Sequence, residues 1–165
     1  MTPAITLDEL LAWNEESAAF WNEHLTASPN LLELPCTIGR ASTVQEFIRH
    51  IWGVELIWAL RISGLPQMPG ADMPKGPLTA LWDLHVQAMA ICRRIIDDPA
   101  HDWDATLTLN VEWLPEKLRA GSHRKFMAHA LFHSQRHWAQ LTTLLREAGF
   151  PADFKGDMLF SLGLS

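Results

Sequence analysis

The stretch HALFHSQRHWAQLTTLLREAGFP (residues 129–151) has the pattern of a long helix that ends at a defined point. Apolar residues recur at steps of three and four, which is the period of a helix with one buried face. Gly149 followed by Pro151 is a typical helix stop. At about 100° per residue, the predicted buried stripe is made of apolar side chains on one face: Phe126, Ala130, Leu141, Leu144 and Ala148.

The same stretch carries three histidines at a spacing of four: His129, His133 and His137. The period places His133 and His137 near the centre of the predicted stripe, with Gln140 on it and His129 at its edge. Side chains four residues apart lie one turn apart on the same side of a helix, so two such rings can reach one ion. Buried polar groups need partners, and a set of core histidines bonded to carbonyls or to each other is the alternative interpretation.

Three other segments have helical period: residues 8–25, 42–64 and 78–97, beside the last one at 122–149. Ser42 with Gln45 three residues later has the spacing of a capping box. Residues 106–114, TLTLNVEWL, alternate enough for a short extended segment but have no evident hairpin partner. These patterns predict an all-α protein, an antiparallel four-helix bundle with short irregular or strand-like connections and one domain over residues 1–165. We expect the tail, Phe154 to Ser165, to pack back on the bundle.

Composition narrows the function classes. The net charge of −6 and the scattered basic residues argue against a nucleic-acid partner. No apolar run approaches the roughly 20 residues of a membrane span. The start MTPAITLDELLAWNEE lacks a basic region, and Cys36 and Cys92 form no CxxC pair, so we expect a cytoplasmic protein. Eight tryptophans without a tyrosine indicate large core fillers or an aromatic pocket.

A third ligand candidate lies on the second predicted helix. His50 flanks the apolar stripe of that helix, and in a bundle this flank can face another helix. Three neutral imidazoles, from His50, His133 and His137, would leave open positions on a divalent ion, as in catalytic zinc sites. Zinc, nickel and iron all accept such ligands. The zinc-protease motif HExxH is not present, because Ser134, Gln135 and Arg136 stand between the histidines.

The stretch 129–151 resembles the C-terminal metal-binding helix of the DinB (damage-inducible) family, within the DinB/YfiT-like superfamily. His133, His137, Gln140 and Gly149 match its motif in order, and HIWGVELIW (residues 50–58) is similar to its second-helix motif, through His50, Glu55 and Trp58. The resemblance implies a four-helix bundle, a homodimer and one divalent metal ion on His50, His133 and His137. It also implies that His129 supports the ligands by hydrogen bonding or packing without being one.

Some members of this superfamily are metal-dependent thiol transferases that use low-molecular-weight thiols. The resemblance therefore implies an enzyme of that type, or a hydrolase using metal-bound water, acting on a small molecule. Glu55, Gln140 and Arg136 are candidates for a base or proton relay, although Glu55 fits a surface or salt-bridge carboxylate equally well. The alternative function is a metal-binding stress-response protein without turnover. Access to the metal separates the two: Trp52, Trp58 and Trp138, the expected pocket residues, would either line a cleft or close over the ion.

Overall fold

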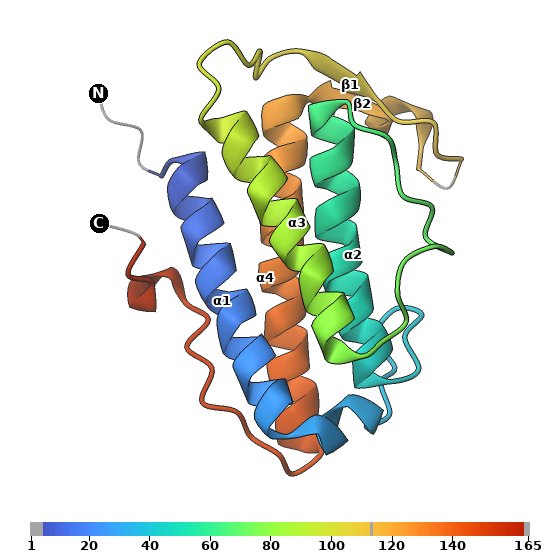
Figure 1. Cartoon of the computed structure of the whole chain (residues 1–165), viewed down its shortest axis with the longest axis vertical. Coiled ribbons are helices and arrows are strands. Elements are labelled where there is room, and N and C mark those ends of the chain that lie inside the picture. The colour runs from blue at the N-terminus through green and yellow to red at the C-terminus, as the bar shows by residue number, and fades with distance from the viewer. Residues whose placement is uncertain (1–4, 113, 164–165) are drawn as a thin grey trace.

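The computed structural model describes residues 5–112 and 114–163, and its main body is a bundle of four helices (Figure 1). The helices are α1 (Leu7–Ala27), α2 (Val44–Ser63), α3 (Leu78–Ile96) and α4 (His123–Glu147). Short 3-10 turns at η1 (Pro29–Glu33), η2 (Glu116–Leu118) and η3 (Met158–Phe160) lie in the connections. The predicted fold class is confirmed, and none of the described helices is long and apolar enough to cross a membrane.

The directions of the helices differ in part from a simple antiparallel bundle. Glu55 contacts His85 and Trp52 contacts Trp82, so α2 and α3 run parallel. In Figure 1 the segment between them returns along the length of α2 before α3 begins. The 20 residues of α2 span about 30 Å at about 1.5 Å per residue. Residues 64–77 cover that length at roughly 3.3 Å each, so an extended connection allows the parallel arrangement.

Helix starts follow local capping chemistry, with one correction to the sequence prediction. Helix α2 is capped by Thr43, whose side chain accepts from the Glu46 N–H, one residue after the predicted Ser42. The Glu46 carboxylate in turn accepts from the Ser42 N–H at 2.8 Å. Gln45, the predicted partner in the box, instead donates to the Lys75 carbonyl. Ser42 with Gln45 and Thr43 with Glu46 both have the three-residue spacing of a capping box. Spacing alone therefore could not show which of the two pairs caps the helix.

The segment before α4 forms a hairpin that the sequence did not reveal. Strand β1 (Thr106–Thr108) pairs antiparallel with β2 (Ala120–Ser122), with Leu107 opposite Gly121. The partner strand is Ala-Gly-Ser, which has little strand propensity of its own. It lies directly before α4, which begins near Ser122 as the sequence predicted, and the Ser122 side chain caps that helix.

Tryptophans fill the centre of the bundle. Trp21, Trp52 and Trp138 are fully buried, and the Trp138 ring lies 6.0 Å from Trp21 and 6.1 Å from Trp52 between centroids. The tail packs back as expected, since the Phe154 ring lies 5.1 Å from Trp21. These rings act as core fillers, joining α1, α2, α4 and the tail.

One buried carboxylate connects all four helices. Glu55 on α2 is 2% exposed and accepts hydrogen bonds from Asn14 on α1 (2.8 Å) and Ser134 on α4 (2.6 Å). Its second oxygen lies 2.7 Å from Nδ1 of His85 on α3, which is equally buried. A buried charge is tolerated when it is paired and hydrogen-bonded in this way. The network therefore ties each helix to a single point in the core.

Replacing Glu55 with alanine tests this connection. The substitution leaves the Asn14 amide, the Ser134 hydroxyl and the His85 ring buried without their acceptor, and we expect a loss of about 3–5 kcal/mol of stability. Urea unfolding at pH 7 measures it. Glu23→Ala, at an exposed position of α1, is the matched control and should change stability by less than about 0.5 kcal/mol. A cost below about 1 kcal/mol for Glu55→Ala would contradict this role for the network.

Candidate metal centre

The structure brings His50, His133 and His137 together. His50 comes from α2 and the other two from neighbouring turns of α4, which runs antiparallel to α2. Their candidate ligand atoms all lie within 4.8 Å of one another. The Nε2 atoms of His133 and His137 are 3.0 Å apart, which allows both to lie about 2.0–2.1 Å from one ion. The three predicted ligands thus form a cluster that could hold a metal ion.

Gln140 fixes the orientation of one of these rings. Its Oε1 atom lies 2.6 Å from Nδ1 of His137, one turn earlier on α4. A carboxamide oxygen only accepts, so His137 carries its proton on Nδ1 and directs the Nε2 lone pair toward His133. Metal-binding histidines usually donate their other ring nitrogen to an oxygen in this way. The donor set therefore fits a metal ion, with Gln140 as the supporting residue.

His133 has no comparable support on its other nitrogen. Its Nδ1 atom is buried and makes no hydrogen bond with any described residue. Without an ion, His133 carries its proton on Nε2 and donates it to His137. With an ion on Nε2, that proton would lie on Nδ1. An ion would bind the lone pairs of both rings, whereas without one the two Nε2 atoms must share a single proton.

The surroundings keep the cluster neutral. Burial, followed by the nearby His137, His50, Arg136 and His129, lowers the pKa of His133 to about 3. Burial also lowers the pKa of His137 to about 4, although the bond with Gln140 raises it. Burial and the Arg136 charge lower the pKa of His50. Neutral imidazoles offer the lone pairs that a metal needs, so protons compete weakly with an ion here.

Arg136 places a positive charge at the edge of the cluster. Its Nη2 donates to Nε2 of His137 at 3.3 Å, and its own side chain is exposed. An ion on this nitrogen would take the place of that hydrogen bond and leave the Arg136 cation beside it. Arg136 is thus positioned to pair with an anion at the site.

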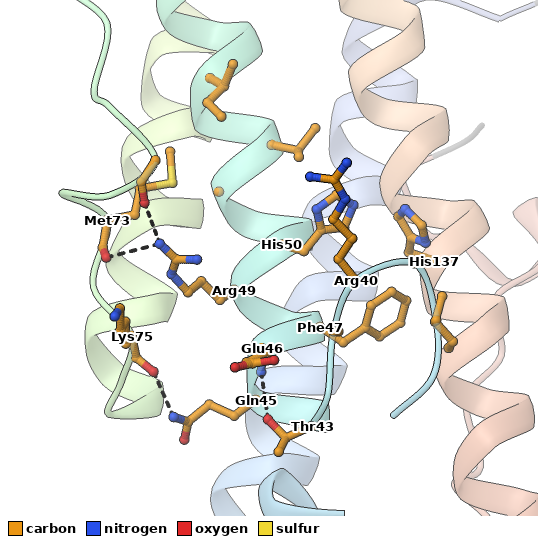
Figure 2. A pocket seen from close by; sticks show the side chains of 17 residues that line it. Arg40, Thr43, Gln45, Glu46, Phe47, Arg49, His50, Met73, Lys75 and His137 are labelled. Atoms are coloured by element: carbon orange, nitrogen blue, oxygen red, sulfur yellow. Dashed lines mark hydrogen bonds between the residues drawn. The ribbon is translucent and has the colours of Figure 1, made fainter. Parts of the chain in front are cut away.

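A cavity of about 800 Å³ opens on two of the three histidines, His50 and His137. Figure 2 shows both rings facing it, His50 from α2 and His137 from α4. The opposite wall is the connection between α2 and α3, fastened by Arg49, which donates to the Pro74 carbonyl at 2.9 Å and to the carbonyls of Gly70 and Met73. A small molecule can therefore reach the cluster.

The predicted pocket tryptophans do not line this cavity. Trp52 and Trp138 belong to the fully buried core, and Trp58 stacks on Phe126 at 4.9 Å between ring centroids. Their apolar period placed them correctly on the buried side, but the opening lies on the flank of α2 that carries His50. The sequence prediction that they form the pocket is corrected in this respect, and they neither roof the cluster nor line its cavity.

Glu55 and His129, two further candidates for the site, do not contact the three histidines by hydrogen bonds among the described residues. Glu55 is absent from the cavity lining and is bound within the four-helix network, so the salt-bridge alternative describes it. His129 is exposed, with its ring 5.9 Å from His133 and 5.3 Å from Trp58 between centroids, so it packs beside the cluster. No hydrogen bond joins His129 to the three histidines among the described residues.

The centre of the buried face of α4 also differs from the predicted stripe. Fully buried positions include Met127, Leu131, Ser134, Trp138 and Leu141, whereas Gln140 and Ala148 are exposed. His133 and His137 therefore lie at the edge of this face, where a ring can reach both the core and the cavity. The sequence analysis did not identify the buried polar residues Asn14, His85 and Ser134. Their position among the apolar residues of a helix was the signal that could have indicated them.

Fold and site together define a class: a four-helix bundle with a histidine cluster able to hold a metal ion between two helices. The family model described as the DinB family matches residues 3–153. The protein belongs to the DinB family. A search of the curated proteins found no match.

The low pKa values of His133 and His137 predict a specific pH dependence for the metal-free protein. Below the ordinary histidine pKa of about 6.5, the unfolded chain binds protons that the folded chain does not. Stability is therefore full above pH 6.5 and falls as the pH drops toward about 4 and then about 3. Partial solvent screening limits the loss to about 1 kcal/mol per histidine between pH 6.5 and 5.

Urea unfolding at pH 7.5 and pH 5, with a chelator present, measures this loss. His133→Gln removes one of the two groups, and its stability should fall less between the two pH values than that of the wild type. Glu23→Ala, exposed on α1 and outside the cluster, should lose as much stability between the two pH values as the wild type does. Equal losses in the wild type and His133→Gln would show that His133 titrates normally in the folded protein.

Proposed function

We propose that this protein is a metal-dependent enzyme that acts on a small molecule, with one divalent ion on His50, His133 and His137. The observation that carries the proposal is the coincidence of a three-histidine cluster with a cavity that reaches it. A purely structural metal site is normally closed by four protein ligands, whereas three ligands leave a position for water or substrate. Zinc, nickel and iron remain the candidate metals.

A bound divalent ion would supply Lewis acidity, which lowers the pKa of a thiol or water and provides a nucleophile near neutral pH. Such an ion would support either thiol S-transfer, using a low-molecular-weight thiol, or hydrolysis by metal-bound water. Gln140 would hold the proton of His137 on Nδ1, keeping its other nitrogen directed at the site. Arg136 would offset the negative charge of a thiolate or hydroxide there.

A second candidate is a metal-binding stress-response protein without turnover. The observation in its favour is that, in the part of the chain that the structure describes, no free carboxylate base lies beside the cluster. Glu46 is the one acidic residue among the described residues that line the cavity, and it is bound to the Ser42 N–H and hydroxyl. Activation of a nucleophile by the metal alone would not need such a base, so this observation leaves the enzyme proposal in place.

Cobalt substitution separates these functions. Protein loaded with Co²⁺ is titrated with 2-mercaptoethanol while its absorption spectrum is recorded. Thiolate coordination at an open position should produce a sulfur-to-cobalt charge-transfer band and shift the ligand-field bands. The His133→Ala variant should show neither effect, because it lacks one of the three ligands. A pH-dependent spectral change without a thiol response would favour the hydrolase type.

A cobalt spectrum unchanged by thiol and by pH would mean that no position on the ion is open. That outcome would contradict the enzyme proposal and support the protein without turnover. His101→Ala is the matched control, since it also removes a partly exposed imidazole but lies outside the cluster.

A further inference from the structure

The cavity beside the histidines carries positive charge, although the whole chain has a net charge of −6. Its lining includes three basic residues, Arg40, Arg49 and Lys75, and one acidic residue, Glu46. Low-dielectric walls strengthen the field of such groups and favour ligands of opposite sign. The local charge is therefore opposite to that of the protein as a whole.

Two of these four groups, Arg49 and Glu46, have hydrogen-bond partners within the chain, whereas Lys75 has only Glu46 near it as an opposite charge. Arg49 donates to three backbone carbonyls of the connection between α2 and α3. The N–H and hydroxyl of Ser42 hold the pKa of Glu46 below its usual range, with smaller contributions from Arg49 and Lys75. Glu46 thus lies near those two cations and partly balances them. Arg40 is left as the cation of the lining without such a neighbour.

Arg40 is free to meet a ligand. Among the described residues it has no ion pair and no side-chain hydrogen bond, and it is exposed. Figure 2 shows its side chain extending from the loop before α2 across the cavity, in front of His50 in this view. A guanidinium keeps its charge at all physiological pH values and can bind carboxylate, sulfonate or phosphate oxygens with two parallel hydrogen bonds.

The rest of the lining is largely apolar. Phe47, Val54, Ile57 and Met73 contribute hydrocarbon or thioether surface. Met73 reaches α2 closely at Gly53, where an added Cβ would lie 2.9 Å from the Met73 sulfur. Glycine at this position lets the connection approach α2 and form a wall. An anion alone would leave this apolar surface uncovered, whereas an amphipathic anion would cover it.

We propose that the cavity binds a small organic anion with an apolar body, and that Arg40 holds its anionic group. The apolar body would cover Val54 and Ile57, which are half-buried, and the bound molecule would border His50 and His137 in the same cavity. A reaction of this molecule at the histidines would rest on the metal-dependent function proposed above. Binding of its anionic group by Arg40 does not depend on that function. Arg40 would then determine which small molecules the protein accepts.

Isothermal titration with two probes of similar length tests the proposal. Hexane-1-sulfonate carries a negative charge but is a weak ligand for divalent metals, and hexan-1-ol carries no charge. Both are titrated into metal-free and zinc-loaded protein at low ionic strength. We expect the wild type to bind the sulfonate about tenfold more tightly than the alcohol, which is the magnitude of one charge-assisted contact. Added salt should reduce this preference.

Arg40→Gln should lose the preference, so that both probes bind with similar affinity, while circular dichroism remains unchanged. Arg94→Gln, at an exposed position of α3 away from the cavity, should keep it. A preference that persists in Arg40→Gln, or no preference in the wild type, would overturn the proposal. A preference present only in zinc-loaded protein would do so too, because the ion would then hold the anion.

The result separates this proposal from the metal-dependent function. If metal-free protein shows the Arg40-dependent preference but no divalent ion binds, the proposed function fails and anion recognition stands. If cobalt-loaded protein binds a thiol but neither loaded nor metal-free protein prefers the sulfonate, the anion proposal fails and the metal function stands.

Discussion

The arrangement of this bundle depends on the buried carboxylate of Glu55. It accepts from Asn14 and Ser134 and pairs with His85, so one group on α2 is joined to each of the other three helices. Apolar packing tolerates small shifts of one helix along another, but a buried carboxylate with fixed hydrogen bonds does not. Ser134 directly follows His133, and Glu55 lies five residues after His50. The contact that sets the register of α2 against α4 therefore also sets the distance between the histidines of the two helices.

The candidate metal centre follows from this register and from its position at the edge of the core. At the centre of the buried face, the histidines would be sealed by Trp52 and Trp138, which are fully buried. At the edge of that face, where they lie, the histidine rings are buried enough to stay neutral and still border a cavity. The connection after α2 completes that cavity because Arg49 fastens it by backbone carbonyls. On α2 and α4, the face packed in the core therefore stabilises the fold, and the neighbouring face gives a small molecule access to the histidines.

The helical period, the helix stops and the ligand spacing were predictable from the sequence because they are local properties. The period of four between His133 and His137, and Gly149 after the last turn, needed no knowledge of other helices. The pairing of β1 with the Ala-Gly-Ser strand, the parallel course of α2 and α3 and the partners of Glu55 depend on contacts distant in the chain. Arg40 could not be assigned to the cavity for the same reason, since it comes from a loop without a periodic pattern. The tryptophans show what the helical period cannot predict. It identified the side of each helix that is buried, but it did not show at which edge of that side a cavity opens.

Metal content is the most direct test of the central claim, which is that His50, His133 and His137 hold one divalent ion. Tag-free wild type and the His50→Ala, His133→Ala, His137→Ala and His101→Ala variants are each incubated with zinc or nickel, desalted and analysed by plasma mass spectrometry. The account predicts close to one ion per chain in the wild type and His101→Ala, and a loss of most of it in each of the other three variants. A wild type that binds no ion, or cluster variants that keep a full ion, would contradict it.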